Sequence, residues 1–504
     1  MTSYTPAPDA RPEGNPTGEP AGGPTLAQQL AAFATHVAAN GVPPEVATSV
    51  GQRTLDILGL CVAAHRLPTS AAAIGHVLDQ GGHAQATIVG VEQQVSAAQA
   101  AFANGVLAHS LDYDDTHLPS VLHPSASVVP AALAAAEHAG ASGETLTRAI
   151  AVGLEVAVRL GMAGYDSELG NSVFFEHGQH ATSITGAMGS AVAAAIAYGL
   201  DEAGIADALG LTASMAAGVI EANRTGGTVK RLHCGVAAQA GVTAAQLVRR
   251  GFTGPPTVLE GRFGFFEAWL HGRFFPEAIT TGLGTEWSAP GIFFKPYPAN
   301  HFTHTTVDAG RALAARGITP EMVAEVTVGV ASATVRTIGE PIEVKRAPVT
   351  GYQAQFSGPY AFAAGLIGGG GLATGLDDYT DALANDPERR ALMAKVSVVG
   401  DPACDAIYPF QFPAVVRLLT TDGHELVEEV LTNRGGPARP LSDEELGRKF
   451  ADNVASRLLD ADAARVSSTI LALPEVVDLT DALRPLTTFI PSHTTTQPTT
   501  KESL

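Results

Sequence analysis

The sequence predicts a mainly α-helical protein that also contains a smaller α+β part. Residues 25–286 consist largely of Ala-rich runs separated by Gly or polar residues, a pattern typical of closely packed helices. From 287 to 437 the pattern changes to alternating, strand-like segments mixed with short helical ones. Because a helical pattern returns over 438–488, we predict a large helical domain made of 25–286 and 438–488, with an α+β lid domain inserted at 287–437.

The first part of the chain contains several predicted core helices. They cover residues 126–140, 143–163, 183–200, 202–222 and 235–251. Aromatic residues make up only 6% of the chain and glycine contributes 54 residues, so small side chains are expected to let these helices approach closely. Two of the runs approach the length of a membrane span, but their Ser, Thr, Gly and Gln content favours buried core helices.

The predicted α+β part contains four segments with the pattern of β-strands. They are residues 323–330, 395–399, 414–420 and 425–430. The last two flank Asp422-Gly423, a dipeptide that is typical of a tight hairpin turn. Alternation of apolar and polar residues in the first two indicates half-buried strands.

Helical patterns lie among and after these strands. We expect two helices within the α+β part, at 307–316 and 358–367. After it, Ser442 and Glu445 have the spacing of a capping box and predict the start of the first returning helix.

The charge and cysteine content restrict the partners and the compartment. With 30 Lys+Arg against 50 Asp+Glu, the net charge of −20 argues against nucleic acid as a partner. A small anionic substrate remains compatible with this charge, because local cations can override the overall field. The three cysteines, Cys61, Cys234 and Cys404, form no disulfide framework or Cys-x-x-Cys motif. That pattern, without a secretory signal or membrane span, predicts a cytoplasmic protein.

The two ends of the chain have a different composition from the rest. Residues 1–24 and 489–504 are rich in Pro and Thr, and the first segment also in Gly and Ala. Such segments cannot bury enough apolar surface to fold, so both are predicted to be disordered tails.

Acidic residues and histidines are concentrated directly after an Ala-rich run. They are His109, Asp112, Asp114, Asp115, His117 and His123. Such density is typical of a catalytic site, because Asp is seldom buried without a partner. Capping or turning of the chain at a helix end is the structural alternative. A divalent cation site is disfavoured, because the run has neither EF-hand spacing nor a His-Glu-x-x-His motif.

A second cluster lies just before the predicted helix 183–200. His177 and His180 precede Thr182 and Ser183, either of which could cap that helix. A helix N-terminus attracts anions, and imidazole is the commonest acid or base in catalysis, so His180 is the stronger functional candidate. Ordinary loop histidines are the alternative.

A third cluster is basic and precedes the predicted helix 235–251. Arg224, Lys230, Arg231 and His233 lie in a Gly-containing segment of an acidic chain. Lys230 could bind a carboxylate as a point charge, while a solvated basic loop is the alternative.

A fourth cluster marks the predicted junction of the two domains. Residues 294–304 combine aromatic residues, prolines, His301 and His304. This composition indicates a rigid loop, and domain junctions are preferred places for ligand clefts.

The order and spacing of these motifs resemble the MmgE/PrpD family over roughly residues 30–485. The resemblance is carried by residues 103–109, 111–116, 123–125, 180, 186–191, 230, 232–233, 259–266, 294–298 and 303–304. It implies a large helical domain with a smaller α+β lid and, as is usual in the family, a homodimer.

Resemblance to the decarboxylase members of the family implies the residues around the pocket. These are Asp112, Thr116, His123, His180, Lys230 and His304. His233 and Arg224, from the basic cluster, are further candidates for substrate binding. This chain has Asn300-His301 where some members differ, and its spacer from Thr116 to His123 is one residue longer than in the decarboxylases.

The family's known reactions imply one kind of chemistry, in which a carbanion forms or is quenched next to a carboxylate. We expect His123 and His180 to act as the acid and base and Lys230 to anchor a carboxylate. Asp112 and Thr116 would orient these groups, and His304 would complete the site from the lid. The scheme requires neither a metal nor another cofactor.

The favoured function is a hydro-lyase like 2-methylcitrate dehydratase. It would act on a small di- or tricarboxylate, or on a carboxylated natural-product intermediate. A decarboxylase of the cis-aconitate type is the first alternative, and an epimerase of the same family is the second. A non-catalytic helical scaffold is disfavoured because it has no use for four pocket-type polar groups. The expected partners are a small carboxylate and a second copy of the chain, not nucleic acid or a membrane.

Overall fold

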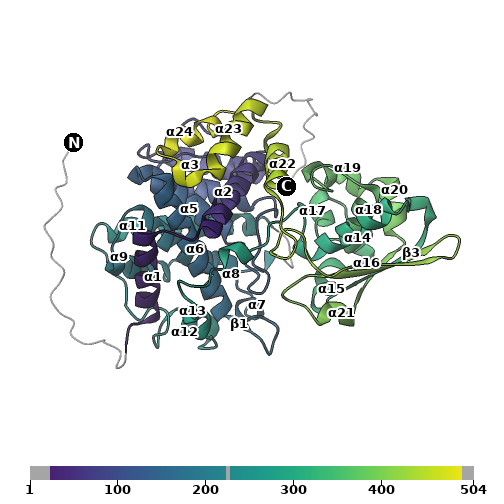
Figure 1. Ribbon diagram of the computed structural model, residues 1–504, viewed down its shortest axis with the longest axis horizontal. Coiled ribbons are helices and arrows are strands. Elements are labelled where there is room, and N and C mark those ends of the chain that lie inside the picture. The colour runs from purple at the N-terminus through teal and green to yellow at the C-terminus, as the bar shows by residue number, and fades with distance from the viewer. Residues whose placement is uncertain (1–22, 223–226, 491–504) are drawn as a thin grey trace.

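The computed structural model describes residues 23–222 and 227–490. Figure 1 shows a large bundle of helices beside a smaller part built around a β-sheet. This arrangement confirms the predicted class, mainly α with an α+β part. The predicted tails, apart from 23–24 and 489–490, lie outside the described residues, as does Arg224.

Long helices form most of the bundle. Their bounds are α1 Leu26–Asn40, α2 Pro44–Ala64, α3 Pro68–Gln80, α4 Ala97–His109, α5 Ser125–Ala139, α6 Gly143–Ala163, α8 Ala181–Ala197, α9 Glu202–Thr212 and α11 Val229–Val248. Shorter elements connect them: β1 Tyr165–Asp166, β2 Asn171–Ser172, α7 Val173–Glu176, α12 Phe265–Leu270, α13 Glu277–Thr280 and the 3₁₀ turn η1 Ala289–Gly291.

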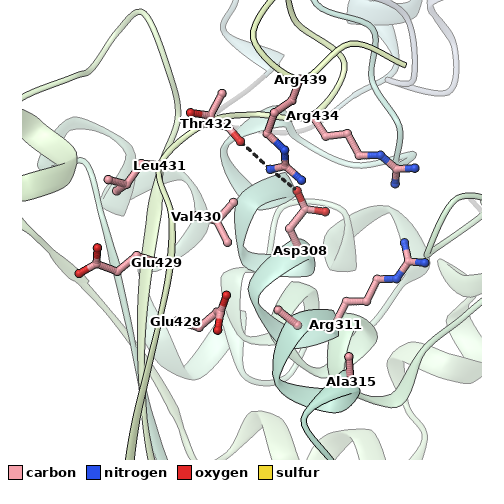
Figure 2. A pocket seen from close by; sticks show the side chains of 11 residues that line it. Asp308, Arg311, Ala315, Glu428, Glu429, Val430, Leu431, Thr432, Arg434 and Arg439 are labelled. Carbon is pink, nitrogen blue, oxygen red and sulfur yellow. Dashed lines mark hydrogen bonds and ion pairs between the residues drawn. The ribbon is translucent and has the colours of Figure 1, made fainter. Parts of the chain in front are cut away.

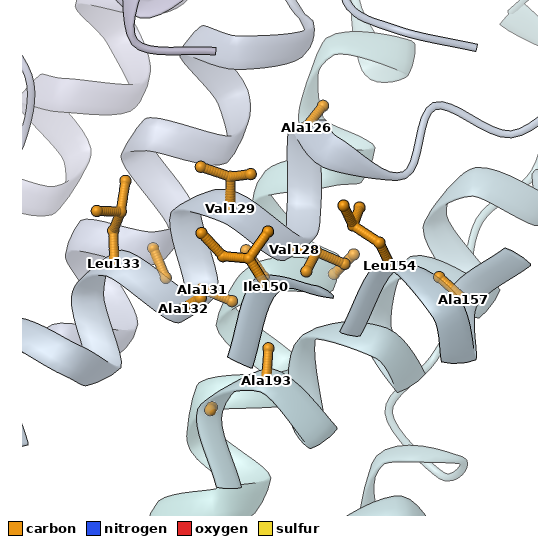
Figure 3. Close-up of a cluster of buried hydrophobic side chains, with 14 of the residues drawn as sticks. Ala126, Val128, Val129, Ala131, Ala132, Leu133, Ile150, Leu154, Ala157 and Ala193 are labelled. Atoms are coloured by element: carbon orange, nitrogen blue, oxygen red, sulfur yellow. The ribbon is translucent and has the colours of Figure 1, made fainter. Parts of the chain in front are cut away.

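Small residues allow the central helices to pack at very short range, as predicted. Figure 3 shows the cluster where Val128 of α5 meets Leu154 of α6 and Ala193 of α8. A Cβ atom on Gly153 would lie 2.8 Å from the main-chain oxygen of Gly189 and 2.7 Å from Val128. Glycine is therefore required where α6 crosses α8, because any side chain would push the two helices apart.

Several helix ends differ from the sequence prediction, and three of these differences lie at the site. The N-cap of α8 is His180, so the prediction of Thr182 or Ser183 as the cap is wrong. Helix α9 ends at Thr212 instead of 222, because the following segment pairs with the chain beside His180, whose N–H donates to Gly218 O at 3.0 Å. Gly218 has a φ of +156° and lies against His180 and Ser183, where a side chain would not fit.

Helix α11 begins at Val229 instead of 235. Gly235, which resembles a helix boundary in the sequence, lies within α11 at its contact with α4, where a Cβ atom would be 2.6 Å from Phe102 O. Lys230 and His233 consequently lie in the first two turns of a helix and not in a loop.

The sheet has the strand order β4-β3-β5-β6. Its strands are β3 Val323–Val330, β4 Val396–Gly400, β5 Ala414–Thr420 and β6 Glu425–Val430. β3 runs parallel to β4 and antiparallel to β5, while β5 and β6 form the predicted hairpin around Asp422-Gly423. The two predicted helices are confirmed as α14 His304–Ala315 and α18 Gly358–Ile367, which pack on each other and on the sheet.

Short helices and turns complete the part around the sheet. They are η2 His301–Thr303, η3 Pro320–Met322, α15 Ser332–Ile338, α16 Ile342–Lys345, α17 Gly351–Ala354, η4 Leu376–Asp378, α19 Asp381–Ala384, α20 Pro387–Met393 and α21 Pro402–Asp405.

The C-terminal helices pack on the bundle. They are α22 Asp443–Val454, α23 Asp460–Leu471 and α24 Leu479–Leu483, with η5 Leu473–Glu475 and η6 Arg484–Leu486. Ser442 and Glu445 form the predicted capping box. Phe450, Val466 and Leu479 belong to the same hydrophobic core as α2. The predicted domain boundaries near 287 and 437 themselves remain predictions.

Within the described residues no single helix is both long and apolar enough to cross a membrane. The bent pair α2–α3, with 96° between its helices, has the length and composition of a membrane span, but no other feature of one is described.

The close crossing of α6 and α8 makes a testable prediction. Gly153→Ala should lower the free energy of unfolding by about 1–3 kcal/mol, since its Cβ atom has no space. Gly75→Ala is the matched control, because that position in α3 has no atom within 4 Å of an added Cβ and should gain up to about 1 kcal/mol. Urea denaturation measures both values, and equal effects of the two changes would contradict the packing described.

Candidate active site

Four segments bring charged residues and histidines together. They are the loop after α4, the N-terminus of α8, the first turns of α11 and the segment before α14. Three of the imidazole rings are close neighbours. The ring centroid of His109 lies 5.2 Å from that of His123 and 6.0 Å from that of His180. All three histidines are buried.

Asp112 is held between two lysines. Its Oδ1 accepts hydrogen bonds from Lys230 Nζ at 3.0 Å and Lys295 Nζ at 3.1 Å, and Lys295 also donates to its main-chain oxygen at 2.7 Å. Asp112 has a φ of 53°, a left-handed conformation that Asp adopts more readily than most residues. The second carboxylate oxygen, Oδ2, is buried without a hydrogen-bond partner within the described residues.

Opposing effects set the charge of this group. Burial alone would raise the pKa of Asp112, but the ammonium groups of Lys230 and Lys295 outweigh it and hold the pKa well below its usual value. Burial likewise lowers the pKa of Lys230, and the carboxylate of Asp112 reverses that effect. The carboxylate and the ammonium of Lys230 therefore stabilise each other as ions.

Asp114 is paired with His109. Its Oδ2 lies 2.8 Å from His109 Nδ1 and 3.9 Å from His123 Nδ1. Burial opposes ionisation of Asp114, but these two imidazoles together lower its pKa below the usual value. Asp114 Oδ1 and His109 Nε2 are buried and have no hydrogen-bond partner in the part of the chain that is described.

The surroundings of His123 determine which ring nitrogen carries its proton. Its Nδ1 lies 2.7 Å from the main-chain oxygen of Asp115, which can only accept, so the Nδ1–H must donate. The Nε2 of the neutral ring consequently keeps a free lone pair. Burial lowers the pKa of His123 to about 3, so the ring is neutral at pH 7. Thr182, which does not cap α8, instead accepts the main-chain N–H of His123 at 3.2 Å.

His180 and His233 form a pair across α8 and α11. Their Nδ1 atoms are 2.8 Å apart, so one ring donates to the other and the two rings have opposite tautomers. Burial is the main reason why both pKa values are lowered, to about 4 for His233 and further for His180. At neutral pH both rings are therefore neutral, and one of them carries its proton on Nε2 while the other has a free lone pair there.

The segment before α14 adds two more buried imidazoles. The ring centroids of His301 and His304 lie 4.5 Å apart. His304 Nε2 donates to Ala299 O at 3.1 Å, which leaves its Nδ1 as an acceptor. His304 Nδ1 and both nitrogens of His301 are buried without a hydrogen-bond partner among residues 23–222 and 227–490. Burial lowers the pKa of His304 to about 3 and holds that of His301 well below its usual value.

Asp115 and Lys449 connect the loop after α4 to neighbouring helices. Asp115 pairs with the buried guanidinium of Arg53 at 2.7 Å and accepts the hydroxyl of Ser125. Lys449, from α22, contacts Asp56 at 2.7 Å, donates to the main-chain oxygen of Tyr113 at 3.1 Å and lies over its ring. The C-terminal helices thus help to hold the residue between Asp112 and Asp114.

The structure brings most of the predicted site residues together. Asp112, His123, His180, Lys230, His233 and His304 all belong to this buried cluster. Thr116 borders it, with Oγ1 at 3.4 Å from His123 Nδ1. His117 instead bonds Ser120 at 2.6 Å, and exposed His177 contacts the main chain of Trp269. The roles assigned to the predicted residues remain predictions.

Three contributors to the cluster were not predicted as site residues: Lys295, His301 and the pair of His109 with Asp114. Lys295 and His301 lie in the fourth sequence cluster, residues 294–304, but nothing in that pattern shows that both side chains are buried. His109 and Asp114 stood in the acidic run, but nothing in their spacing shows that the chain turns between them.

A separate surface cavity of about 570 Å³ lies between α14 and β6. Figure 2 shows Asp308 and Arg439 joined by an ion pair within it, beside Arg311 and Arg434. Tyr297 contacts both regions, because its hydroxyl donates to Asp308 and its ring centroid lies 5.3 Å from that of His304.

Two lysines that share one aspartate, and buried imidazoles with unused hydrogen-bonding atoms, are features typical of an enzyme active site. Comparison with known proteins agrees with this class. Residues 28–277 match the MmgE/PrpD N-terminal domain and residues 297–474 match the MmgE/PrpD C-terminal domain. The chain therefore belongs to the MmgE/PrpD family.

The relatives include named enzymes. The chain is 31% identical to cis-aconitate decarboxylase from Homo sapiens over 397 residues, which cover 76% of this chain and 77% of that protein. It is 26% identical to cis-aconitate decarboxylase from Aspergillus terreus over 474 residues, or 90% of this chain and 94% of that protein. These relationships show that the protein is an enzyme of this family.

The buried histidines predict how stability depends on pH. A histidine whose pKa is lower in the folded than in the unfolded state costs stability once the pH falls below its unfolded value of about 6.5. His123, His180, His233, His301 and His304 all have lowered pKa values. The free energy of unfolding should therefore fall between pH 6.5 and 5, by up to about 1.4 kcal/mol per pH unit for each such histidine.

Urea denaturation from pH 8 to pH 5 measures this slope. Replacement of His123 by Gln should reduce the slope, whereas replacement of exposed His83 by Gln should leave it unchanged. A stability that stays constant from pH 7.5 to pH 5.5 would contradict the neutral, buried state of these rings.

Proposed function

We propose that this protein is a lyase that removes a proton next to a carboxylate of a small di- or tricarboxylic acid and expels a β-hydroxyl as water. In this reaction the proton passes to a histidine, the C–O bond breaks, and the hydroxide leaves with a proton from a second acid. The product is an alkene, and the side chains described above supply every group that the scheme uses.

The tautomer of His123 carries this proposal. Its Nδ1–H is committed to Asp115 O, so the free lone pair of Nε2 is ready to accept a proton. Proton abstraction needs a base within hydrogen-bond reach of the proton, and the position of that base is judged before its pKa. Decarboxylation has less need of it, because loss of carbon dioxide itself generates the carbanion.

Two lysines suit the substrate's carboxylates and the charge that develops during the reaction. Lys230 and Lys295 lie on the same oxygen of Asp112, and a carboxylate entering the site would approach both ammonium groups. Such preorganised cations stabilise an enolate-like transition state more strongly in a buried site than in water. Lys295 therefore joins Lys230 as a proposed carboxylate anchor.

The paired imidazoles suit the role of the acid. If His233 donates the hydrogen bond between the two Nδ1 atoms, His180 carries its own proton on Nε2 and can give it to the departing hydroxide. His180 then takes up the Nδ1 proton of His233, and His233 regains a proton from water. The ring of His180 is a neighbour of the ring of His109, which is itself a neighbour of the ring of His123. We propose His180 as the group that protonates the departing hydroxide.

Decarboxylation of cis-aconitate or a related acid is the second candidate. The names of the relatives from human and Aspergillus terreus support it, since both are cis-aconitate decarboxylases. In that reaction His180 or His123 would protonate the carbanion left after carbon dioxide departs. The two candidates use the same anchors and differ in which bond breaks.

Proton NMR in deuterated buffer separates the two. The purified protein is incubated with 2-methylcitrate, citrate, cis-aconitate and iminodisuccinate in turn. We expect an alkene product from a hydroxy acid. Formation of a decarboxylated product from cis-aconitate with release of carbon dioxide would favour the second candidate, and deuterium uptake without a new product would indicate an epimerase.

Replacement of the proposed base gives a direct prediction. His123→Gln should lower kcat by roughly 10²–10⁴-fold, the usual contribution of a general base, with little change in the melting temperature. Steady-state kinetics and circular dichroism check this, with exposed His83→Gln as the control. Undiminished turnover of a folded His123→Gln variant would refute the role of His123.

Replacement of Lys295 tests the second anchor. Lys295→Met removes one of two ammonium groups beside Asp112, so it should raise the KM for the substrate roughly tenfold or more. It should also raise the pKa of Asp112, because burial is then less compensated. An unchanged KM in a folded Lys295→Met variant would show that Lys230 holds the carboxylates without it.

A further inference from the structure

His301 is the most completely unsatisfied polar side chain near the site. Only 4% of the residue is exposed, and neither Nδ1 nor Nε2 has a hydrogen-bond partner in the described parts of the chain. Buried polar groups are nearly always paired, because an unpaired one loses its hydration without compensation. Two unpaired atoms on one ring therefore point to a group that binds there.

The chemistry of that group follows from the ring. Burial keeps the pKa of His301 well below its usual value, so the imidazole is neutral and offers one donor and one acceptor. A hydroxyl group also donates one hydrogen bond and accepts others. One hydroxyl can therefore pair with either ring nitrogen of His301, by donating to the acceptor or by accepting from the N–H, whereas a carboxylate can pair only with the N–H.

The neighbours of His301 favour an uncharged group too. The rings of Phe293 and Phe412 lie edge-on to it, with centroids 6.0 and 5.6 Å away, and His304 lies alongside. Among the charged groups that act on His301, Lys295 is already bound to Asp112. A substrate carboxylate is better placed at the two lysines than against these aromatic rings.

We propose that His301 binds a hydroxyl group of the substrate and so selects hydroxylated polycarboxylic acids over their deoxy counterparts. This inference rests on the proposed function and adds a substrate class to it. His301 acts here in binding; no proton transfer is assigned to it. Because cis-aconitate has no hydroxyl group, the same selectivity would favour dehydration over decarboxylation.

Isothermal titration calorimetry with matched acids tests the proposal. Citrate is compared with propane-1,2,3-tricarboxylate, and malate with succinate, since each pair differs by one hydroxyl group. For the natural chain we expect the hydroxy acid of at least one pair to bind roughly tenfold more tightly or better, because the deoxy acid leaves His301 unpaired.

Two variants separate hydrogen bonding from shape. H301F keeps an aromatic ring without donor or acceptor, and should reduce the preference to less than threefold while binding of the deoxy acid stays within threefold. H301Q keeps both a donor and an acceptor, and should retain part of the preference. If H301F does not fold, H301L supplies the same apolar comparison.

The outcomes distinguish this inference from the function on which it rests. Equal binding of both members of each pair by the natural chain, or a preference that persists in H301F, would overturn the role of His301 alone. Failure of the natural chain to bind any of the four acids would count against the proposed function and the inference together. Loss of the preference in H301F with partial retention in H301Q would support both.

Discussion

The site depends on the ion cluster in which Asp112 is held between Lys230 and Lys295. Its three members come from the loop after α4, the first turn of α11 and the segment before α14, so the cluster joins distant parts of the chain. A buried charge is costly unless it is paired, and removal of one partner leaves the others uncompensated. Asp112 therefore holds two cations side by side, and under the proposed function it would fix where an incoming carboxylate binds. The support from Lys449 and Arg53 behind the same loop ties this arrangement to the C-terminal helices and to α2.

Burial also determines the protonation of the histidines around that cluster. In water an imidazole is partly protonated near neutral pH, whereas burial keeps these rings neutral and makes their hydrogen bonds decide which nitrogen carries the proton. The contact with Asp115 O leaves the lone pair of His123 on Nε2, and the contact between His180 and His233 divides one donor and one acceptor between two rings. The same physical effect would suit the proposed proton transfer, and it makes the fold sensitive to acid. Asp114 adds a buried negative charge, which would stabilise the ring of His123 once that ring becomes protonated.

Much of this could be predicted from the sequence, and the exceptions have physical reasons. The hairpin at Asp422-Gly423 and the cap at Ser442 depend on local chemistry, so local patterns identified them. The start of α11 was predicted too late because Gly235 resembles a helix boundary. The glycine is instead needed where α11 packs closely on α4, and this contact is a property of the packed fold. Lys295 and His301 could not be assigned for a related reason: burial and the lack of a partner are visible only when the segments come together. The resemblance to a family named most of the remaining cluster but not the hydrogen bonds that give each ring its role.

The proposed chemistry requires that His123 is neutral at pH 7, with its proton on Nδ1 and a free lone pair on Nε2. ¹⁵N NMR of the protein with labelled histidine reports the protonation of each ring nitrogen, and comparison with His123→Gln assigns the signal. We predict a protonated Nδ1 and an unprotonated Nε2 for His123 at every pH from 8 to 5.5, because burial lowers its pKa to about 3. Protonation of Nε2 at pH 7, or titration of His123 near pH 6.5, would contradict the account.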